Sequence, residues 1–485
     1  MMTIEQIAAL LAERVVPGEI PDIVKPVCIV TGDNYQMGFQ YGQQLQKNIR
    51  TRTLHLAARL MAARPNVDII ADAYRYEEIL RTQSPELIEM FKGTAEGADL
   101  PYEAILVYTI LNLAQASPNQ CSTISAWGSA ALDGHLIAGC NADGAAFTHT
   151  SYEPTLVMYP NEGNVSVNNG GYNSNFAMNN KGLVILASNG GWNGRKDDRG
   201  IGTPSVLPAM HLNWCCSNAK EAVERYTLHS APISAAENLH CADISGDAFL
   251  IEATHAHYYV RRPGEHGEKD YLLATNFFLS EEMQSSKPAS NASYINAQFR
   301  YRTEDKLLKG NYGKITLETI DGILSSRDYY DGEKWVKDVW DEEYSKWTPE
   351  KRSHRNATYM QCLADPERRT AYIRQGQSCV TSSGMPGSTG KFSRLVLKDT
   401  PLAMVMDAEE EAKRQVFSLS ERLETGRLAM DWSVERRMNE AKRCVWEGST
   451  QMARALAFGN DINQYMLNLG KAATSFSKAQ VLANI

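Results

Sequence analysis

The sequence lacks the features that would place it at a membrane or on nucleic acid. Its 485 residues contain no apolar run close to the ~18 residues that span a bilayer. The first residues show neither the basic flank nor the small-residue cleavage site of a signal peptide. Lys and Arg are scattered singly or in pairs, and the net charge is −8, which disfavours nucleic acid and acidic membranes as partners. We therefore expect a cytoplasmic protein.

The sequence also lacks the cysteine and glycine patterns of common cofactor sites. Its nine cysteines include no C-x-x-C pair, so disulfides and a structural zinc site are not expected. The segments "WCCSN" (214–218) and "HAH" (255–257) lack the spacing of metal ligands. The glycine-rich "GGWNGRKDDRGIG" (190–202) lacks the order of a phosphate-binding loop and is interpreted as a loop near the pocket. We expect no metal and no cofactor.

What is present divides the chain into three parts. Residues 1–120 have helical periodicity, apart from a predicted strand in "PVCIVTG" (26–32). The second part is residues 121–400. Residues 121–290 are rich in Gly, Asn and Thr and carry short β-type runs, interrupted by a predicted pair of helices, and two helical segments and two strands are predicted after them. Residues 401–485 contain no proline after Pro401, and their apolar residues fall on helical stripes. Those stripes are interpreted as packing surfaces or as contacts in a possible homo-oligomer.

The boundary between the first two parts is "SPNQCSTISAWGSAALDGHLIAGCNADG" (117–144). A strand-like run follows Cys121, and Asp133-Gly134 lies between two apolar runs, which is a strong signal for a hairpin turn. Taken alone, a cysteine at such a place is more often a small buried residue than a nucleophile.

A nucleophilic role for Cys121 would need a base. A thiol attacks a carbonyl at neutral pH only when a neighbouring group removes its proton or lowers its pKa. The α-amino group of the same residue, with an ordinary pKa of about 7.7 to 8.0, can be that base. This arrangement requires Cys121 to be the first residue of its chain, and therefore predicts cleavage of the Gln120–Cys121 bond.

The region around Cys121 resembles a known family. "CSTISAWGSAALDGHLIAGCNAD" (121–143) is similar to the start of the catalytic subunit in the isopenicillin-N acyltransferase-like family of cysteine N-terminal-nucleophile (Ntn) hydrolases. "GDNYQMGFQYGQQL" (32–45) and "FKGTAEGADLPYEAIL" (91–106) resemble its pro-segment. The resemblance runs from about residue 30 to residue 376. It implies an α+β fold, a four-layer α/β/β/α sandwich, with a helical pro-segment (1–120), a catalytic domain (121–400) and a helical C-terminal extension (401–485).

The resemblance also implies roles for individual residues. Cys121 would be the nucleophile, and Asp143 would hold its freed amine. The side chain of Asn276 and the backbone N–H of Asn189 would donate to the oxyanion. Arg300 would line the site and steady Asp143 or the amine.

Each of these residues also has an ordinary structural interpretation. Asp143 could cap backbone N–H groups at a strand end, while Asn189 and Asn276 could satisfy loop backbone. Arg300 could pair with a surface carboxylate, and a structural role is favoured for Glu252.

Two positions depart from the family pattern. Cys140 stands where many relatives have Arg or Gln, which would place a second thiol near the site. Gln120 stands where some relatives have glycine, so a different residue precedes the proposed cleavage point.

We therefore expect a self-processing cysteine amidohydrolase that cleaves a small linear amide through an acyl-enzyme on Cys121. In this interpretation the pro-segment stays associated as a subunit. One alternative is an acyltransferase that moves the acyl group to an amine. Another is an uncleaved protein that acts in binding or assembly.

Overall fold

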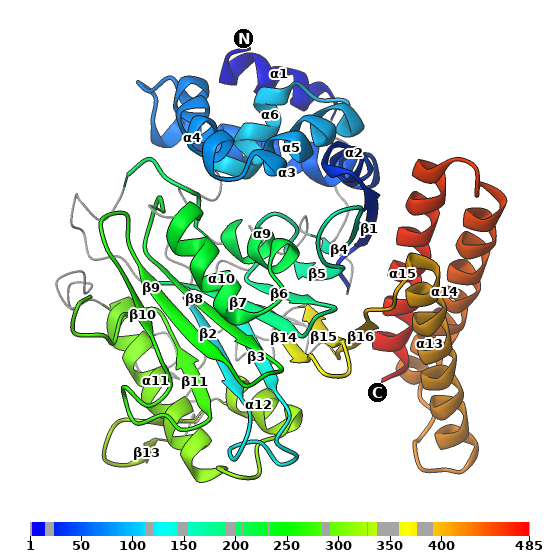
Figure 1. Ribbon diagram of the computed structural model, residues 1–485. Coiled ribbons are helices and arrows are strands. Elements are labelled where there is room, and N and C mark those ends of the chain that lie inside the picture. The colour runs from blue at the N-terminus through cyan, green and yellow to red at the C-terminus, as the bar shows by residue number, and fades with distance from the viewer. Residues whose placement is uncertain are drawn as a thin grey trace, which may run out of the picture.

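Two stacked β-sheets form the centre of the protein (Figure 1). The computed structural model describes residues 2–14, 24–111, 120–143, 154–190, 200–205, 207–230, 233–283, 292–326, 328–336, 358–375 and 391–484. The eight-stranded sheet contains, in spatial order, β1 (Val27–Gly32), β4 (Thr155–Pro160), β5 (Ser166–Asn169), β6 (Phe176–Asn179), β7 (Leu183–Asn189), β8 (Glu237–Asp243), β9 (Ala248–Ala253) and β10 (Tyr258–Arg261). The six-stranded sheet contains β11 (Tyr271–Ala274), β2 (Gln120–Ala126), β3 (Ile137–Asp143), β14 (Thr358–Asp365), β15 (Thr370–Gln375) and β16 (Ser393–Val396). A separate ribbon pairs β12 (Tyr329–Tyr330) with β13 (Trp335–Val336).

Helices cover the outer face of each sheet. The helices on the side of the eight-stranded sheet are α1 (Ile4–Arg14), α2 (Asn34–Gln44), α3 (Gln46–Ala63), α4 (Ile69–Gln83), α5 (Pro85–Ala98), α6 (Tyr102–Leu106), α9 (Leu207–Cys215) and α10 (Ala219–Arg225), with π-helical turns at Val107–Leu111 and Tyr226–Ser230. The six-stranded sheet is covered by α11 (Ala292–Gly310) and α12 (Leu317–Leu324). These layers form a four-layer α/β/β/α sandwich, and this predicted architecture is confirmed.

The strands are apolar on both faces because both faces are buried. On β7, Leu183 and Ile185 pack against the outer helices, while Val184 and Leu186 face the other sheet.

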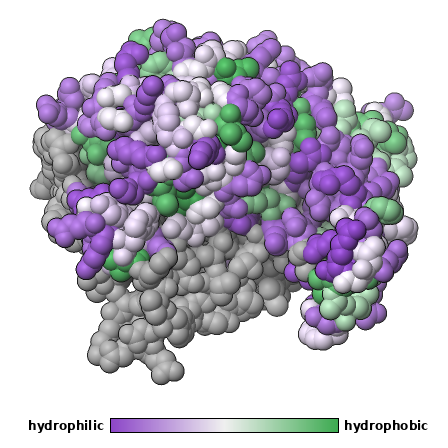
Figure 2. All heavy atoms as spheres, turned by 90° about the horizontal axis from the view of Figure 1, so that it is seen from below, coloured by the Kyte–Doolittle hydropathy of each residue, from purple (hydrophilic) through white to green (hydrophobic). Residues whose placement is uncertain are grey.

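None of the helices in the described residues combines the length and apolar character that crossing a membrane requires. Seen from below, the described residues mix hydrophilic and apolar side chains across the surface (Figure 2).

The segment before Cys121 is joined to the eight-stranded sheet through β1. This strand pairs in parallel with β4, with Val27 opposite Thr155 and Gly32 opposite Pro160. The predicted strand in "PVCIVTG" is therefore confirmed. Residues on both sides of the proposed cleavage point build one sheet.

Glycines set the distance between α2 and α5. Gly38 and Gly42 on α2 face Gly93 and Gly97 on α5, so that the two backbones touch. A Cβ atom added at Gly38 would lie 2.0 Å from the Met90 carbonyl oxygen, a distance that atoms cannot adopt without moving the helices apart. This contact explains the glycine spacing in the two segments that resemble the family's pro-segment.

An ion pair ties α5 to α9. His211 Nε2 lies 2.5 Å from Glu86 Oε1, and Arg225 Nη2 donates to the same oxygen at 2.8 Å. Burial alone would raise the pKa of Glu86, but the hydrogen bond and charge of His211, with Arg225, lower it to about 2. Burial would lower the pKa of His211, but Cys215 and Glu86 raise it to about 9. The imidazolium and carboxylate are both charged at neutral pH.

The predicted hairpin after Cys121 is present, but the prediction of a turn at Asp133-Gly134 is wrong. β2 ends at Ala126 and β3 begins at Ile137, so a long loop, not a two-residue Asp-Gly turn, joins them. The Trp127 N–H donates to the Asp270 carbonyl oxygen at 2.9 Å, and the Leu132 N–H donates to Ile315 at 3.0 Å. These contacts draw the chain out of the ladder and override the local preference of Asp133-Gly134.

The C-terminal helices close one open side of the sandwich. They are α13 (Pro401–Glu424), α14 (Trp432–Ala457) and α15 (Ile462–Ala483), and they stand beside the sheets (Figure 1). On α15, Thr474 Oγ1 accepts from the N–H of Val27 on β1 at 2.8 Å, and Gln480 Oε1 accepts from the N–H of Arg394 on β16 at 2.7 Å. One helix thus satisfies the edge strands of both sheets. Ala408 and Phe476 join the core between the sheets, so the predicted packing role of the stripes is confirmed.

The glycine contact predicts a large loss of stability on adding a single methyl group. In Gly93→Ala the new Cβ would lie 2.1 Å from the Tyr35 carbonyl oxygen, and overpacking of this kind costs about 1–3 kcal/mol. Urea denaturation measures the change. The control is Gly322→Ala on α12, where no described atom beyond the neighbouring residues and backbone of its own helix lies within 4 Å of the added Cβ and the higher helix propensity of Ala gains up to about 1 kcal/mol. Equal midpoints for the two variants would contradict the close contact.

Candidate active site

Cys121 is the second residue of β2 and lies at the beginning of the strand. Its side chain shares a face with Thr123 and Ser125, because alternate residues of a strand point the same way. Both of these contact His240 on β8, so this face is directed into the space between the two sheets. Cys121 is 5% exposed.

Asn276 holds the backbone nitrogen of Cys121. The Cys121 N–H donates to Asn276 Oδ1 at 2.7 Å, and the Asn276 amide nitrogen donates to the Asn189 carbonyl oxygen at 2.7 Å. β11 ends at Ala274, opposite Thr123. Beyond this point the side chain of Asn276, and not the backbone of β11, accepts the hydrogen bond from β2. Asn189, Asn276 and Cys121 are brought together from three separate strands or strand ends.

Arg300 on α11 contacts the same point from the helical layer. Its Nη1 donates to the Cys121 carbonyl oxygen at 2.6 Å and to Ser122 Oγ at 2.9 Å, and its Nη2 donates to Asn276 Oδ1 at 2.7 Å. Ser122 Oγ in turn donates to Glu304 Oε1 at 2.7 Å. Arg300 is 1% exposed, and these hydrogen bonds join it to the carbonyl of Cys121, the hydroxyl of Ser122 and the amide of Asn276.

The register of the hairpin places Asp143 beside the proposed cleavage point. Cys121 pairs with Ala142, and Gln120 pairs with Asp143. The side chains of Gln120 and Asp143 lie outside the described part of the structure, so the contact of Asp143 with the freed amine stays a prediction. Residues 191–199, most of the predicted pocket loop, also lie outside it.

The backbone around Asn276 is anchored by two buried side chains. Asn238 Nδ2 on β8 donates to the Thr275 carbonyl oxygen at 2.7 Å and to that of Phe277 at 3.3 Å. The carboxylate of Glu252 accepts from the N–H groups of Leu279 at 2.9 Å and Ser280 at 3.1 Å. Glu252 thus has the predicted structural role, and Asn238 fixes the residues on both sides of Asn276.

A second thiol lies close to Cys121. Cys140 pairs across the strands with Thr123 on one side and with Cys362 on the other, diagonally placed from Cys121. Burial raises the pKa of Cys140 well above its usual range, aided by its hydrogen bond with Cys362 and by the nearby Cys121. This thiol remains protonated and unreactive at neutral pH.

Asn175 lies against this second thiol. The Cys140 thiol donates to the Asn175 carbonyl oxygen at 3.7 Å. Asn175 is 7% exposed, and within the described residues neither atom of its side-chain amide has a hydrogen-bond partner. A buried amide without a partner is costly, which marks this position as one where a ligand could supply the missing bonds.

His240 contacts β2 directly, and its imidazole ring is neutral. Its Nε2 lies 2.7 Å from Ser125 Oγ, and its Nδ1 lies 3.3 Å from Thr123 Oγ1. Burial, with a contribution from the charge of Arg261, lowers its pKa to about 3. It therefore packs and hydrogen-bonds beneath the strand of Cys121 as a neutral ring.

Sequence reasoning missed several of these residues. Glu304 follows Arg300 by one helical turn, so helical spacing could have indicated it. Asn175, Asn238 and His240 carried no local signal, since each acts through a partner distant in sequence.

The comparison with protein families settles the affiliation of the chain. The family model described as acyl-coenzyme A:6-aminopenicillanic acid acyl-transferase matches residues 133–378, which is just over half of the 485 residues. The chain belongs to this family. The resemblance inferred from the residues is confirmed, and membership of this family supports the prediction that the protein is an enzyme. The match begins at Asp133, so it includes Asn189, Asn276 and Arg300 but not Cys121.

Solved structures show a weak likeness to this acyltransferase-family chain. Penicillin V acylase from Agrobacterium tumefaciens has 12% identity over 53% of this chain and 83% of its own, with a TM-score of 0.33. A mutant form of conjugated bile acid hydrolase from Clostridium perfringens has 13% identity over 53% of this chain and 89% of its own, with a TM-score of 0.31. A search of curated proteins found no match. The assignment of the fold depends on the sheets and helical layers described above.

The neutral state of His240 predicts a pH dependence of stability. Its pKa is about 3 in the folded protein and about 6.5 in the unfolded chain. The unfolded state therefore binds more protons between these values, and stability falls as the pH falls through this window. We expect this residue to account for a loss of about 2 kcal/mol between pH 7 and pH 5, measured by urea denaturation. In His240→Gln that part of the pH dependence should disappear; an unchanged slope would contradict the assignment.

Proposed function

We propose that the protein is a self-processing cysteine amidohydrolase in which Cys121 becomes an N-terminal residue and attacks a small linear amide. The observation that carries the proposal is the contact of buried side chains with the backbone of Cys121. Asn276 Oδ1 lies 2.7 Å from its nitrogen, and Arg300 Nη1 lies 2.6 Å from its carbonyl oxygen. Within a strand these groups usually pair with a neighbouring strand. Here side chains hold them, at the point where the backbone nitrogen would become the catalytic amine.

Maturation begins with the thiol of Cys121. Its sulfur attacks the carbonyl carbon of Gln120, the C–N bond breaks, and the acyl group moves to sulfur as the nitrogen takes up the thiol proton. Water then hydrolyses this thioester, which releases the carboxylate of Gln120 and restores the thiol. The products are a segment that ends at Gln120 and a segment that begins with the free amine of Cys121.

Turnover uses the same atoms again. The free amine accepts the thiol proton, and the thiolate attacks the amide carbon of the substrate. Asn276 Nδ2 and the backbone N–H of Asn189 donate to the oxyanion, and Asp143 orients the amine in this proposal. The amine of the substrate leaves with the proton, and water hydrolyses the acyl-enzyme.

Asn175 is the residue proposed to form hydrogen bonds with the polar groups of the substrate. It is buried, and neither atom of its amide has a partner within the described residues. The thiol of Cys140, which lies diagonally across the strands from Cys121, contacts its backbone, and this supports a position on the same side of the sheet as the nucleophile. An amide substrate offers one donor and one acceptor, which an Asn side chain can match.

A second candidate reaction is acyl transfer to an amine. The family to which the chain belongs is described as an acyltransferase, and this favours the alternative. The two reactions share the acyl-enzyme and differ in the molecule that accepts the acyl group. They are separated by adding amines to the assay and measuring amide synthesis against hydrolysis.

Cleavage of the chain is the first test. Denaturing electrophoresis of purified wild type should show two fragments, of 120 and 365 residues, with mass spectrometry locating the cut before Cys121. Cys121→Ala should give one uncut chain, whereas Cys140→Ala, which removes the neighbouring buried thiol, should still be cut. An intact wild-type chain without amidase activity would contradict the proposal and favour a binding or assembly protein.

The anchoring of Asn276 predicts graded losses of activity. With a substrate found by mass-spectrometric screening of amides, Asn276→Ala should lower kcat by about 10²–10³. Asn238→Ala should lower kcat about tenfold with less effect on KM, because it shifts Asn276 without touching the substrate.

The matched control is Asn164→Ala, which removes another buried Asn that donates to a carbonyl, that of Cys216 at 2.7 Å. We expect it to lose stability with kcat retained. Full activity of Asn276→Ala in a cleaved chain would refute its role as an oxyanion donor.

A further inference from the structure

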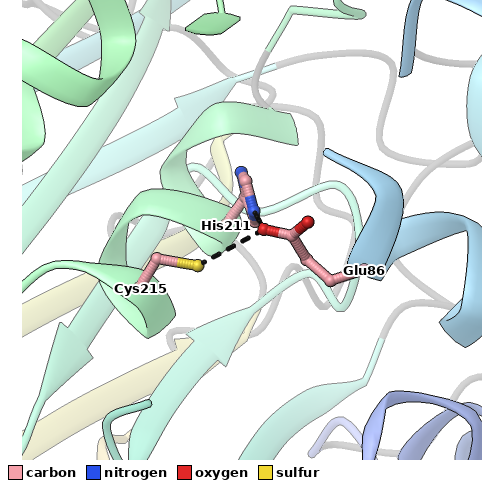
Figure 3. Close-up of side chains that lie close together, drawn as sticks. All are labelled: Glu86, His211 and Cys215. Carbon is pink, nitrogen blue, oxygen red and sulfur yellow. Dashed lines mark hydrogen bonds and ion pairs between the residues drawn. The ribbon is translucent and has the colours of Figure 1, made fainter. Parts of the chain in front are cut away.

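Three side chains that the proposed reaction does not use converge between α5 and α9. Glu86 reaches from α5, and His211 and Cys215 reach from α9 toward the same point (Figure 3). One ligand atom from each lies within 4.8 Å of the other two. His211 and Cys215 are four residues apart, so they share one face of α9.

These are the three types of ligand that bind zinc in proteins. Zinc bonds are about 2.0–2.2 Å to nitrogen and oxygen and about 2.3 Å to sulfur, so tetrahedral ligand atoms lie about 3.3–3.7 Å apart. Cys215 Sγ and Glu86 Oε1 are 3.8 Å apart, and His211 Nε2 and Glu86 Oε1 are 2.5 Å apart. The distance between His211 Nε2 and Glu86 Oε1 needs to increase by only about 1 Å for the three atoms to admit an ion of this size.

The other ring nitrogen of His211 has the partner that a metal-bound histidine usually has. His211 Nδ1 lies 3.2 Å from Ser84 Oγ, and both residues are buried. Such an outer contact fixes the ring so that Nε2 faces the ion. It is an observation independent of the three ligands.

We propose that Glu86, His211 and Cys215 bind a divalent cation of the zinc class, with water as the fourth ligand. On binding, the proton between His211 and Glu86 and the proton of the Cys215 thiol leave to solvent, and three bonds to the cation replace them. The Arg225 guanidinium, 2.8 Å from Glu86 Oε1, competes with the cation for this oxygen. The site joins the segment before Gln120 to the segment after Cys121, but binding does not depend on cleavage.

Cobalt is the probe. Co²⁺ titrated into chelator-treated full-length protein should give the visible bands of a tetrahedral ion and a thiolate-to-cobalt band in the near ultraviolet, at one ion per chain. Zn²⁺ should displace it. The titration is repeated in Cys121→Ala, which removes the proposed nucleophile as a competing thiol. An absence of both bands in both proteins would overturn the proposal and leave an ion pair only.

Variants assign the bands to this site. Cys215→Ser should abolish the thiolate band, while Cys216→Ala, which removes the adjacent buried thiol, should keep it. Ser84→Ala should weaken Co²⁺ binding about tenfold, and Arg225→Gln should tighten it.

Retention of the thiolate band in Cys215→Ser, or its loss in a folded Cys216→Ala, would place the ion elsewhere and overturn the assignment. Since binding in Cys121→Ala needs no maturation, a failure of self-cleavage leaves this test unaffected.

Discussion

The site depends on one buried guanidinium. Arg300 is 1% exposed, yet it donates to the carbonyl of Cys121, the hydroxyl of Ser122 and the amide oxygen of Asn276. A buried charge is tolerated only with partners, and the acidic side of this network is supplied by Glu304 through Ser122. The planar fork of arginine can bind several acceptors at fixed angles. It thereby sets the position of strand β2, the loop after β11 and helix α11 relative to one another.

Much of this arrangement could be predicted from the sequence. Short β-type runs indicated the strands, and the motif around Cys121 led to the family and its layers. Cys121, Asn276 and Arg300 are distant in sequence and close in space, as the resemblance implied. The atoms involved could not be predicted: the oxygen of Asn276 faces Cys121, and Arg300 contacts a carbonyl and an amide. Such details depend on where β11 ends and on which face of α11 contacts β2. Both are properties of the tertiary structure.

The error in the predicted position of the hairpin turn has the same origin. Asp133-Gly134 is a strong local turn signal, but backbone hydrogen bonds from Trp127 and Leu132 to distant segments lengthen the loop. The segment "WCCSN" shows no ligand spacing within itself. Cys215 of this segment lies close to His211, one turn earlier on α9, and to Glu86, more than a hundred residues away. Local patterns describe single elements, whereas a three-residue cluster is assembled by the packing of two.

The pairing of β1 with β4 has a further consequence. Residues 27–32 supply the edge of the eight-stranded sheet, where they lie between β4 and helix α15. A chain cut before Cys121 would therefore be a heterodimer whose smaller member completes a sheet of the larger. Its unfolding would separate two molecules instead of extending one, so the melting temperature would rise with protein concentration. Recovery from the unfolded state would likewise become an encounter between partners, slower in dilute solution.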